Sequence, residues 1–250
     1  IQSAVDNAES GDTIEIEEGT YNEQVVLNRG EISDLVIKAR EGASEKPLVY
    51  YENSDNAEPT FAVDTDGVEI EGLEIKRNNS NGNVGQAVRV AGDNIVLNDN
   101  AYNVDNSEDS AISVLTDSSG ASSVETFDED ITSVSIEGGE INAEGSSTSG
   151  LLIANTSGDN EITETAVSVD DVTFADTEGA HFLELDSSVS TLNVSETLSD
   201  NSFTTAAGVS QGNKLIYEGA YNVTSKISST IQGSIKVAAI GAKVEVLDGT

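Results

Sequence analysis

Short runs in which apolar and polar residues alternate recur along the whole chain. Thr13–Glu17, for example, alternates with a period of two, which is typical of a β-strand that buries one face. Before it, Ile1, Ala4, Val5 and Ala8 would share one face of a short amphipathic helix. The pattern therefore predicts an all-β protein that begins with a short helix.

From residue 87 onward, three kinds of strand-like run follow one another in a fixed order. The first kind occurs at residues 87–90, 111–115, 151–153, 181–185 and 214–217. The second kind follows at 94–97, 133–136, 166–169 and 191–194, and the third at 101–104, 139–141, 172–174 and 201–203. An earlier copy of the unit spans residues 66–75. Successive second runs begin 25 to 39 residues apart, so we expect the extra residues in loops, chiefly 78–85, 117–130, 145–150 and 156–165.

Three short strands per repeat are typical of a parallel β-helix, in which stacked coils share one core of Val, Ile and Leu. We expect a single domain over residues 1–250. Residues 1–10 would form the N-terminal cap and 11–220 the coils, and 221–250 would be a terminal coil or the start of a neighbouring module. The alternative is an antiparallel β-sandwich or tandem immunoglobulin-like domains. It is less favoured because the chain has only two Pro and the order of the runs is unbroken.

Acidic residues dominate the composition. The 250-residue chain has 46 Asp and Glu against 11 Lys and Arg, which gives a net charge of −35. This balance argues against binding nucleic acid through a basic surface, and against an anionic membrane surface. Abundant acid with scarce Lys is typical of a halophile, because molar salt screens the repulsion between the carboxylates. A calcium-loaded surface protein from a less saline place is the alternative.

Other chemistries are limited by what the composition lacks. Without Cys, the chain has no disulfide, no Cys zinc site and no Cys nucleophile. No apolar stretch approaches the roughly 18 residues that span a bilayer, so we expect no membrane insertion in this segment. The abrupt start at Ile1 and end at Thr250 indicate a processed or partial piece of a longer protein.

The N-terminal stretch carries a recognisable motif. It consists of Ile1-Gln2, Ala4, Ala8, Gly11-Asp12-Thr13-Ile14, Gly19-Thr20-Tyr21 and Glu23. This stretch resembles the entry into pectin-lyase-like β-helices, and Gly67–Ile75 resembles their generic repeat. Over residues 1 to about 220, the resemblance implies a right-handed parallel β-helix whose open end is capped by a short helix. It says little about function, because this superfamily mixes lyases, hydrolases, esterases, epimerases and structural solenoids.

Enzymes with this fold act on acidic polysaccharides, and the resemblance suggests where to look for their residues. Lyase-like members use an Arg or Lys as base or charge neutraliser, and Lys76-Arg77 is the only basic doublet. The hydrolase motifs are not matched: Gly179-Ala-His181 departs from Gly-His-Gly, and no Arg-Ile-Lys follows Asp170-Asp171. We therefore keep Lys76, Arg77 and His181 as weak catalytic candidates. A solvated charge pair and a hydrogen-bonded structural His are the favoured interpretations.

Two further kinds of site are suggested by the sequence. Carboxylates could hold Ca²⁺, the only cofactor that we consider, although none of them has EF-hand spacing. The candidates are Asp64, Asp66, Asp105, Asp109, Asp128 and Asp130. Four Asn-X-Ser/Thr sequons are glycosylation candidates: Asn78, Asn155, Asn193 and Asn222. We expect a glycan at Asn78 or Asn155, because both fall in predicted loops.

Because no catalytic set is matched, the leading hypothesis is a non-enzymatic, extracellular structural or adhesive protein of a halophile's surface. It would form a homo-oligomer or polymer with copies of itself. The N-terminal helix would cap one end, and the C-terminal end, which lacks an obvious cap, would stack on a partner. One alternative is a lyase, hydrolase or epimerase that acts on acidic glycans. The other is a glycan-binding module that uses the Tyr50-Tyr51 pair, with surface glycans as its partners.

Overall fold

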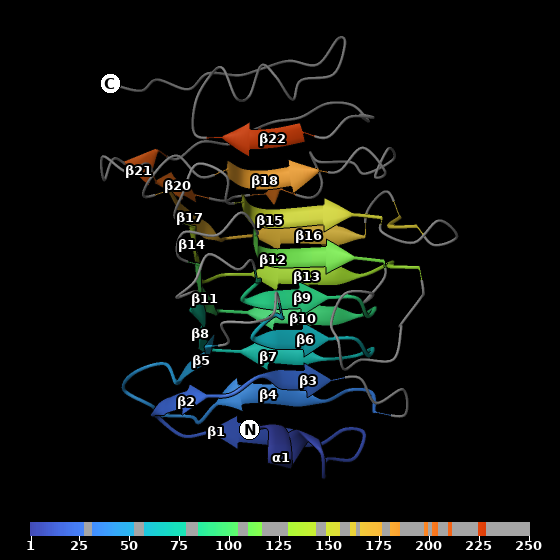
Figure 1. The fold of residues 1–250 in the computed structure, drawn as a ribbon, viewed down its shortest axis with the longest axis vertical. Coiled ribbons are helices and arrows are strands. Elements are labelled where there is room, and N and C mark those ends of the chain that lie inside the picture. Colours follow the sequence, from blue (N-terminus) through green and yellow to red (C-terminus); the bar gives the residue numbers. More distant parts are fainter. Residues whose placement is uncertain are drawn as a thin grey trace.

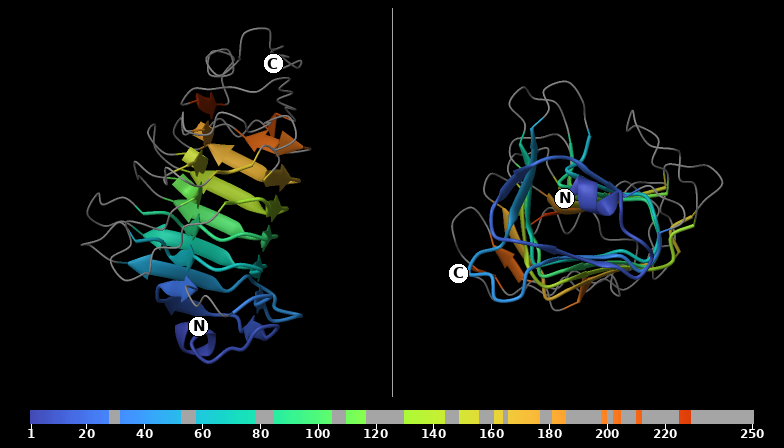
Figure 2. Two further views of the ribbon diagram at one scale, coloured as in Figure 1. Left: turned by 90° about the vertical axis from the view of Figure 1, so that its right-hand side faces the viewer. Right: turned by 90° about the horizontal axis from the view of Figure 1, so that it is seen from below.

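The chain forms a parallel β-helix, which Figure 1 shows as a stack of coils that starts at the N-terminus and follows the sequence along the stack. The structure is a computed structural model. It describes residues 1–27, 32–52, 58–78, 85–104, 110–116, 130–143, 149–155, 161–163, 166–176, 181–185, 198–199, 202–204, 210–211 and 225–228. Seen along the stack, the three sheets form three sides around a common interior (Figure 2). The predicted all-β fold with parallel coils is confirmed.

The strands fall into three sheets, here called A, B and C. Sheet A contains β1 (Thr13–Ile16), β4 (Val36–Ala39), β7 (Glu69–Glu71), β10 (Ile95–Asn98), β13 (Val134–Glu137), β16 (Val167–Asp170) and β19 (Leu198–Ser199). Sheet B contains β2 (Thr20–Asn22), β5 (Leu48–Glu52), β8 (Glu74–Asn78), β11 (Ala101–Val104), β14 (Glu140–Ala143), β17 (Thr173–Asp176), β20 (Ser202–Thr204) and β21 (Ser210–Gln211). Sheet C contains β3 (Val25–Leu27), β6 (Phe61–Val63), β9 (Val88–Val90), β12 (Ser110–Leu115), β15 (Ser149–Ala154), β18 (His181–Leu185) and β22 (Ser225–Ser228).

The first six coils, β1 to β18, each contribute one strand to each sheet in the order A, B, C, which is the order that the sequence runs predicted. Strands β5 and β6 were missed at the sequence level, although Leu48–Glu52 has the β-branched and aromatic composition of a strand. The predicted strand at 191–194 lies outside the described residues, and the sheet A strand of that coil is β19 instead. The predicted loop at 145–150 is too long, because β15 already begins at Ser149.

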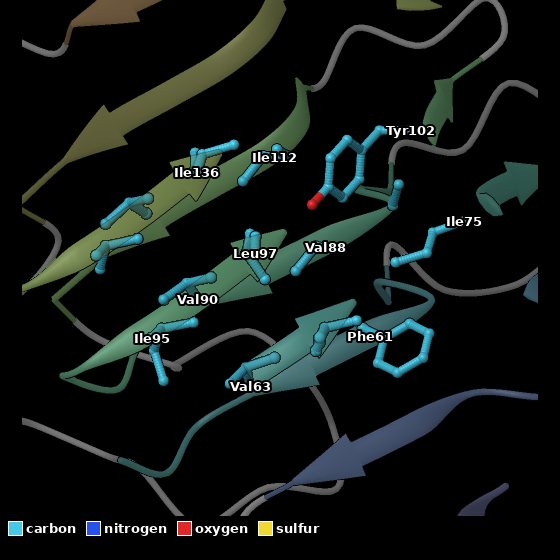
Figure 3. Packing of buried hydrophobic residues seen from close by; sticks show 14 of the residues in the cluster. Phe61, Val63, Ile75, Val88, Val90, Ile95, Leu97, Tyr102, Ile112 and Ile136 are labelled. Carbon is cyan, nitrogen blue, oxygen red and sulfur yellow. The ribbon is translucent and has the colours of Figure 1, made fainter. Parts of the chain in front are cut away.

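The core is built from rows of inward side chains that stack from coil to coil. In sheet A, the middle of the row consists of Ile37, Ile70, Leu97 and Ile136, all fully buried. Figure 3 shows Leu97 and Ile136 beside inward residues of the other two sheets, such as Val88 and Tyr102. Every second residue faces inward because side chains alternate along a strand. This is why the period-two pattern predicted the strands.

Polar groups close the corner between sheets A and B. Asn100 is fully buried there: its Oδ1 accepts the N–H of Leu73, and its Nδ2 donates to Ile70 O and Tyr102 Oη at 2.8 and 3.0 Å. In the next coil, Gly139 has φ +79°, and a Cβ at this position would overlap the backbone of Asn100. Gly139 is therefore required both for its backbone angle and for this close approach.

The two ends of the stack differ from the prediction. Helix α1 (Gln2–Val5) makes a single turn, so Val5 is buried but Ala4, predicted to share its face, is exposed. At the C-terminal end, β21 pairs antiparallel with β20, and β22 pairs antiparallel with β18. These reversed strands interrupt the parallel stacking of sheets B and C. The expectation of an uncapped C-terminal end stays a prediction, because most of the residues there lie outside the described part of the chain.

Candidate functional site

Lys76 and Arg77 do not form a joint site, because they lie on opposite faces of β8. Lys76 is on the outward row of sheet B, in register with Tyr50 and Asn103. Arg77 has the inward parity and is only 1% exposed. Its Nη1 donates to the carbonyl oxygen of Tyr51 at 2.6 Å, and its guanidinium lies 5.1 Å from the centre of the Tyr51 ring. Arg77 thus fastens one coil to the preceding one.

Burial also sets the electrostatics of Arg77. Desolvation lowers the pKa of its guanidinium below the ordinary value, while the neighbouring Tyr51 and Glu58 act in the opposite direction. Glu58 is itself buried, and its Oε2 accepts a hydrogen bond from the Tyr51 hydroxyl at 3.3 Å. The three side chains form a compact group inside the corner between sheets B and C. A base for an external polysaccharide would instead have to reach the solvent.

A second buried cation, which sequence reasoning missed, lies on the outward row of sheet C. Arg89 alternates with Val88 and Val90 and should therefore be solvated, yet it is 5% exposed. Its Nη2 donates to Oδ2 of the fully buried Asp64 at 2.8 Å. Ala62 and Ser113, its neighbours in the same row, are also fully buried. Alternation alone could not reveal that this part of the outer face is covered.

Each calcium candidate in the described part of the chain has a different hydrogen-bond partner. Asp64 carries the ion pair with Arg89, Asp66 Oδ1 accepts the N–H of Asp93, and Asp130 Oδ1 accepts the N–H of Glu161. Among the residues that the structure describes, no group of three or more His, Asp or Glu side chains is placed to hold a metal ion. The remaining candidates, Asp105, Asp109 and Asp128, lie outside those residues.

The other candidate residues are only partly described. His181 begins β18, in register with Ser149, but its side chain lies outside the description, as does that of Asn78 at the end of β8. Asn155 follows β15, and its Oδ1 accepts the N–H of Ile162 at 3.0 Å. Asn193 and Asn222 lie outside the described residues. Glycosylation at all four sequons stays a prediction.

The outer face of sheet B brings together a polar row that the sequence did not reveal. In successive strands, this row contains Asn22, Tyr50, Lys76, Asn103 and Asn142. Asn142 Nδ2 donates to Asn103 Oδ1 at 2.9 Å, and Asn103 Nδ2 donates to Glu74 Oε1 at 3.1 Å. These hydrogen bonds hold the side-chain amides of Asn103 and Asn142 in fixed orientations on the outer face.

The Tyr50-Tyr51 pair is split between the two faces of β5. Tyr50 belongs to the outer row, whereas Tyr51 packs against Arg77. The sequence hypothesis that the two rings form one exposed platform is therefore wrong. The signal that could have corrected it is the alternation within Leu48–Glu52, which was not recognised as a strand.

With the geometry in view, comparison with known proteins adds no relative. No protein-family model, curated protein or solved structure matches the chain. In the described part of the chain, no helix is long and apolar enough to cross a membrane.

Proposed function

We propose that this chain is a non-enzymatic structural or adhesive protein of a cell surface, which works outside the cell and assembles with copies of itself. The observation that carries this proposal is the fate of the cationic side chains. Arg77 and Arg89 are both buried. Arg77 donates a hydrogen bond to the carbonyl oxygen of Tyr51, and Arg89 donates one to the carboxylate of Asp64. An enzyme that acts on acidic polysaccharides needs such cations where the substrate can touch them.

The proposal is tested by electron microscopy and light scattering of the purified chain in roughly 3 M salt, with and without Ca²⁺. Filaments, sheets or defined oligomers are expected, and uniform monomers under all conditions would overturn it. Calcium is part of the proposal only if its removal changes the assembly.

A turnover assay on uronate polymers tests the alternative that the chain is an enzyme. No turnover is expected. Activity that is lost in Lys76→Ala or His181→Ala, and kept in Lys38→Ala, would replace the structural proposal with an enzymatic one. Lys38 is a suitable control because it lies on the outer row of sheet A, between Glu15 and Glu71.

We also propose that the surface is adapted to high salt. Glu137 and Asp170 are exposed direct neighbours on adjacent strands of sheet A, and like charges in this arrangement destabilise a sheet. At about 1 M salt the Debye length falls to about 3 Å, which screens their repulsion. The melting temperature should therefore rise steeply with KCl concentration. A melting temperature that does not change between 0.1 and roughly 3 M salt would contradict this adaptation.

A glycan-binding module is the second candidate, and the outer row of sheet B favours it. An aromatic ring in the same row as hydrogen-bonded amides suits sugar rings, which present C–H faces for stacking and hydroxyl groups for hydrogen bonding. Loss of binding to a glycan array in Tyr50→Ala, with binding kept in Val36→Ala on sheet A, would support it. Absence of binding by the unmodified chain would remove it.

A further inference from the structure

In the first coil, two of the three inward rows begin with a side chain that is incompletely covered by the described residues. Ile14 and Tyr21 begin the rows of sheets A and B, and both are partly exposed. Their neighbours in the second coil, Ile37 and Val49, are fully buried. Val25, which begins the row of sheet C, is also fully buried. Among the described residues, the first coil therefore covers the start of the inward row of sheet C but only partly covers those of sheets A and B.

Sheet C is covered because the side-chain amide of Gln2, in α1, hydrogen-bonds to β3 as the backbone of a further strand would. Gln2 Nε2 donates to the carbonyl oxygen of Val26 at 3.1 Å, and the N–H of Val26 donates to Gln2 Oε1 at 2.6 Å. These two bonds satisfy the edge groups that β3 would otherwise present to solvent. Helix α1 lies against β3 at the end of the stack, as Figure 1 shows.

In the part of the chain that the structure describes, sheet A has no such cover at its N-terminal edge. The carbonyl oxygens of Asp12 and Ile16 accept the N–H groups of Val36 and Arg40 in the second coil. Because backbone groups alternate along a strand, the N–H and C=O of Thr13 and Glu15 point the other way. Among the described strands, β1 is the terminal one of its sheet, so no described strand pairs with these groups.

We propose that this edge is the interface between two copies of the chain, with β1 of one copy antiparallel to β1 of the other and Ile14 at the centre. In that register, each Glu15 lies opposite Thr13 of the partner, so the carboxylates do not face one another. The two Ile14 side chains meet on the inward side and cover each other. The proposal rests on the proposed self-assembly and names its interface.

The occupant is a second copy in antiparallel orientation because a further parallel coil does not fit at this end. Such a coil would place a strand beside β3, and residues 1–5 already occupy that place. Pairing through β1 alone needs no space beside β3. A two-fold axis through Ile14 also makes the contact self-complementary, which is the usual arrangement of homodimers.

The charge of this end makes the interface dependent on salt. Glu15 is exposed, as are Glu17 and Glu18 at the end of the same strand, so two copies repel each other at low ionic strength. The Debye length shrinks from about 10 Å at 0.1 M to about 3 Å at 1 M, so salt should strengthen the association. A contact held by ion pairs would instead weaken with salt.

The first test compares Glu15→Pro with Glu15→Gln. Both remove the same charge, but only Pro removes the edge N–H, and Pro is tolerated on an edge strand. In sedimentation velocity at roughly 1 M salt, we expect dimers for the unmodified chain and for Glu15→Gln. For Glu15→Pro we expect at least a tenfold weaker dimer.

A cross-link tests the register, since the chain has no Cys of its own. Opposite residues of antiparallel strands have Cα atoms about 4.5–5.5 Å apart, within reach of a disulfide. Ile14→Cys should therefore form a covalent dimer on oxidation at high salt. Val96→Cys, partly exposed on the outer face of β10 in mid-stack, should not.

The outcomes separate this inference from the proposed function. Assembly that is unaffected by Glu15→Pro, without cross-linking of Ile14→Cys, overturns the β1 interface and leaves self-assembly through another surface. An unmodified chain that is monomeric at every salt concentration overturns both. Cross-linking of Ile14→Cys supports the interface even if Glu15→Pro fails to fold.

Discussion

The middle coils and the N-terminal coil use the same kinds of interaction in different surroundings. Leu97 and Ile14 occupy the same inward row of sheet A, but Leu97 is fully buried and Ile14 is partly exposed. The Asp64–Arg89 ion pair is buried, whereas Arg40 and Glu17 form an ion pair that is more than half exposed. In a stacked protein, neighbouring coils therefore decide how much an interaction contributes.

The largest difference is expected between the two ion pairs. Arg89→Ala leaves the carboxylate of Asp64 buried without this cation and should lower the free energy of unfolding by about 3–5 kcal/mol. Arg40→Ala should cost no more than about 1 kcal/mol, because exposed pairs are screened by solvent. Urea unfolding in high salt measures both. The double variant Asp64→Leu/Arg89→Met should recover much of the loss, and a double variant as unstable as Arg89→Ala would contradict this explanation.

The next largest difference in unfolding free energy is expected between two positions of the hydrophobic row of sheet A. Leu97→Ala removes a side chain that coils on both sides cover, and should cost about 2–5 kcal/mol. Ile14→Ala should cost clearly less, because its side chain already meets solvent at the end of the stack. The difference in unfolding free energy between the two variants is the measurement. Equal losses would show that the first coil is as well packed as the fourth.

Side-chain amides that hydrogen-bond to backbone groups should likewise contribute more to stability in the middle coils than in the first coil. Asn100→Ala leaves buried groups of Ile70 and Leu73 without their partner and should cost about 1–3 kcal/mol. Gln2→Ala uncovers the two edge groups of Val26, which water can then reach, so about 0.5–1.5 kcal/mol is expected. Thermal unfolding of both variants checks this order.

The smallest expected effect is a dependence of stability on pH that arises from Asp93, at the corner between sheets C and A. Burial raises the pKa of Asp93, but hydrogen bonds from the hydroxyl and N–H of Thr132 and the N–H of Ser133 outweigh it, so the net pKa is lowered. A lowered folded-state pKa stabilises the protein above the unfolded-state pKa, and this contribution is lost as the pH falls through the folded value. Asp93→Asn should therefore reduce the loss of stability below about pH 4. Parallel curves of stability against pH for the variant and the unmodified chain would contradict it.

Much of the fold could be predicted because one physical rule produces both pattern and structure. Alternation along 94–97, 101–104 and 133–136 corresponds to β10, β11 and β13 within a residue or so. The candidate site was less predictable, because Lys76-Arg77 looks like one basic patch in sequence. Only its placement in β8 shows that the two side chains point to opposite faces. The outer row of Tyr50, Asn103 and Asn142 is likewise a product of register between distant strands.

By itself, the sequence determined that this chain would stack short strands around a shared aliphatic core, since period-two alternation and a repeated order of runs are local properties. Tertiary structure alone decided which polar residues are buried, because Arg89 and Asn100 are enclosed by parts of the chain that are distant in sequence. It also decided how the ends are closed. Gln2 can satisfy Val26 only when residues 24 positions apart in the chain are brought together.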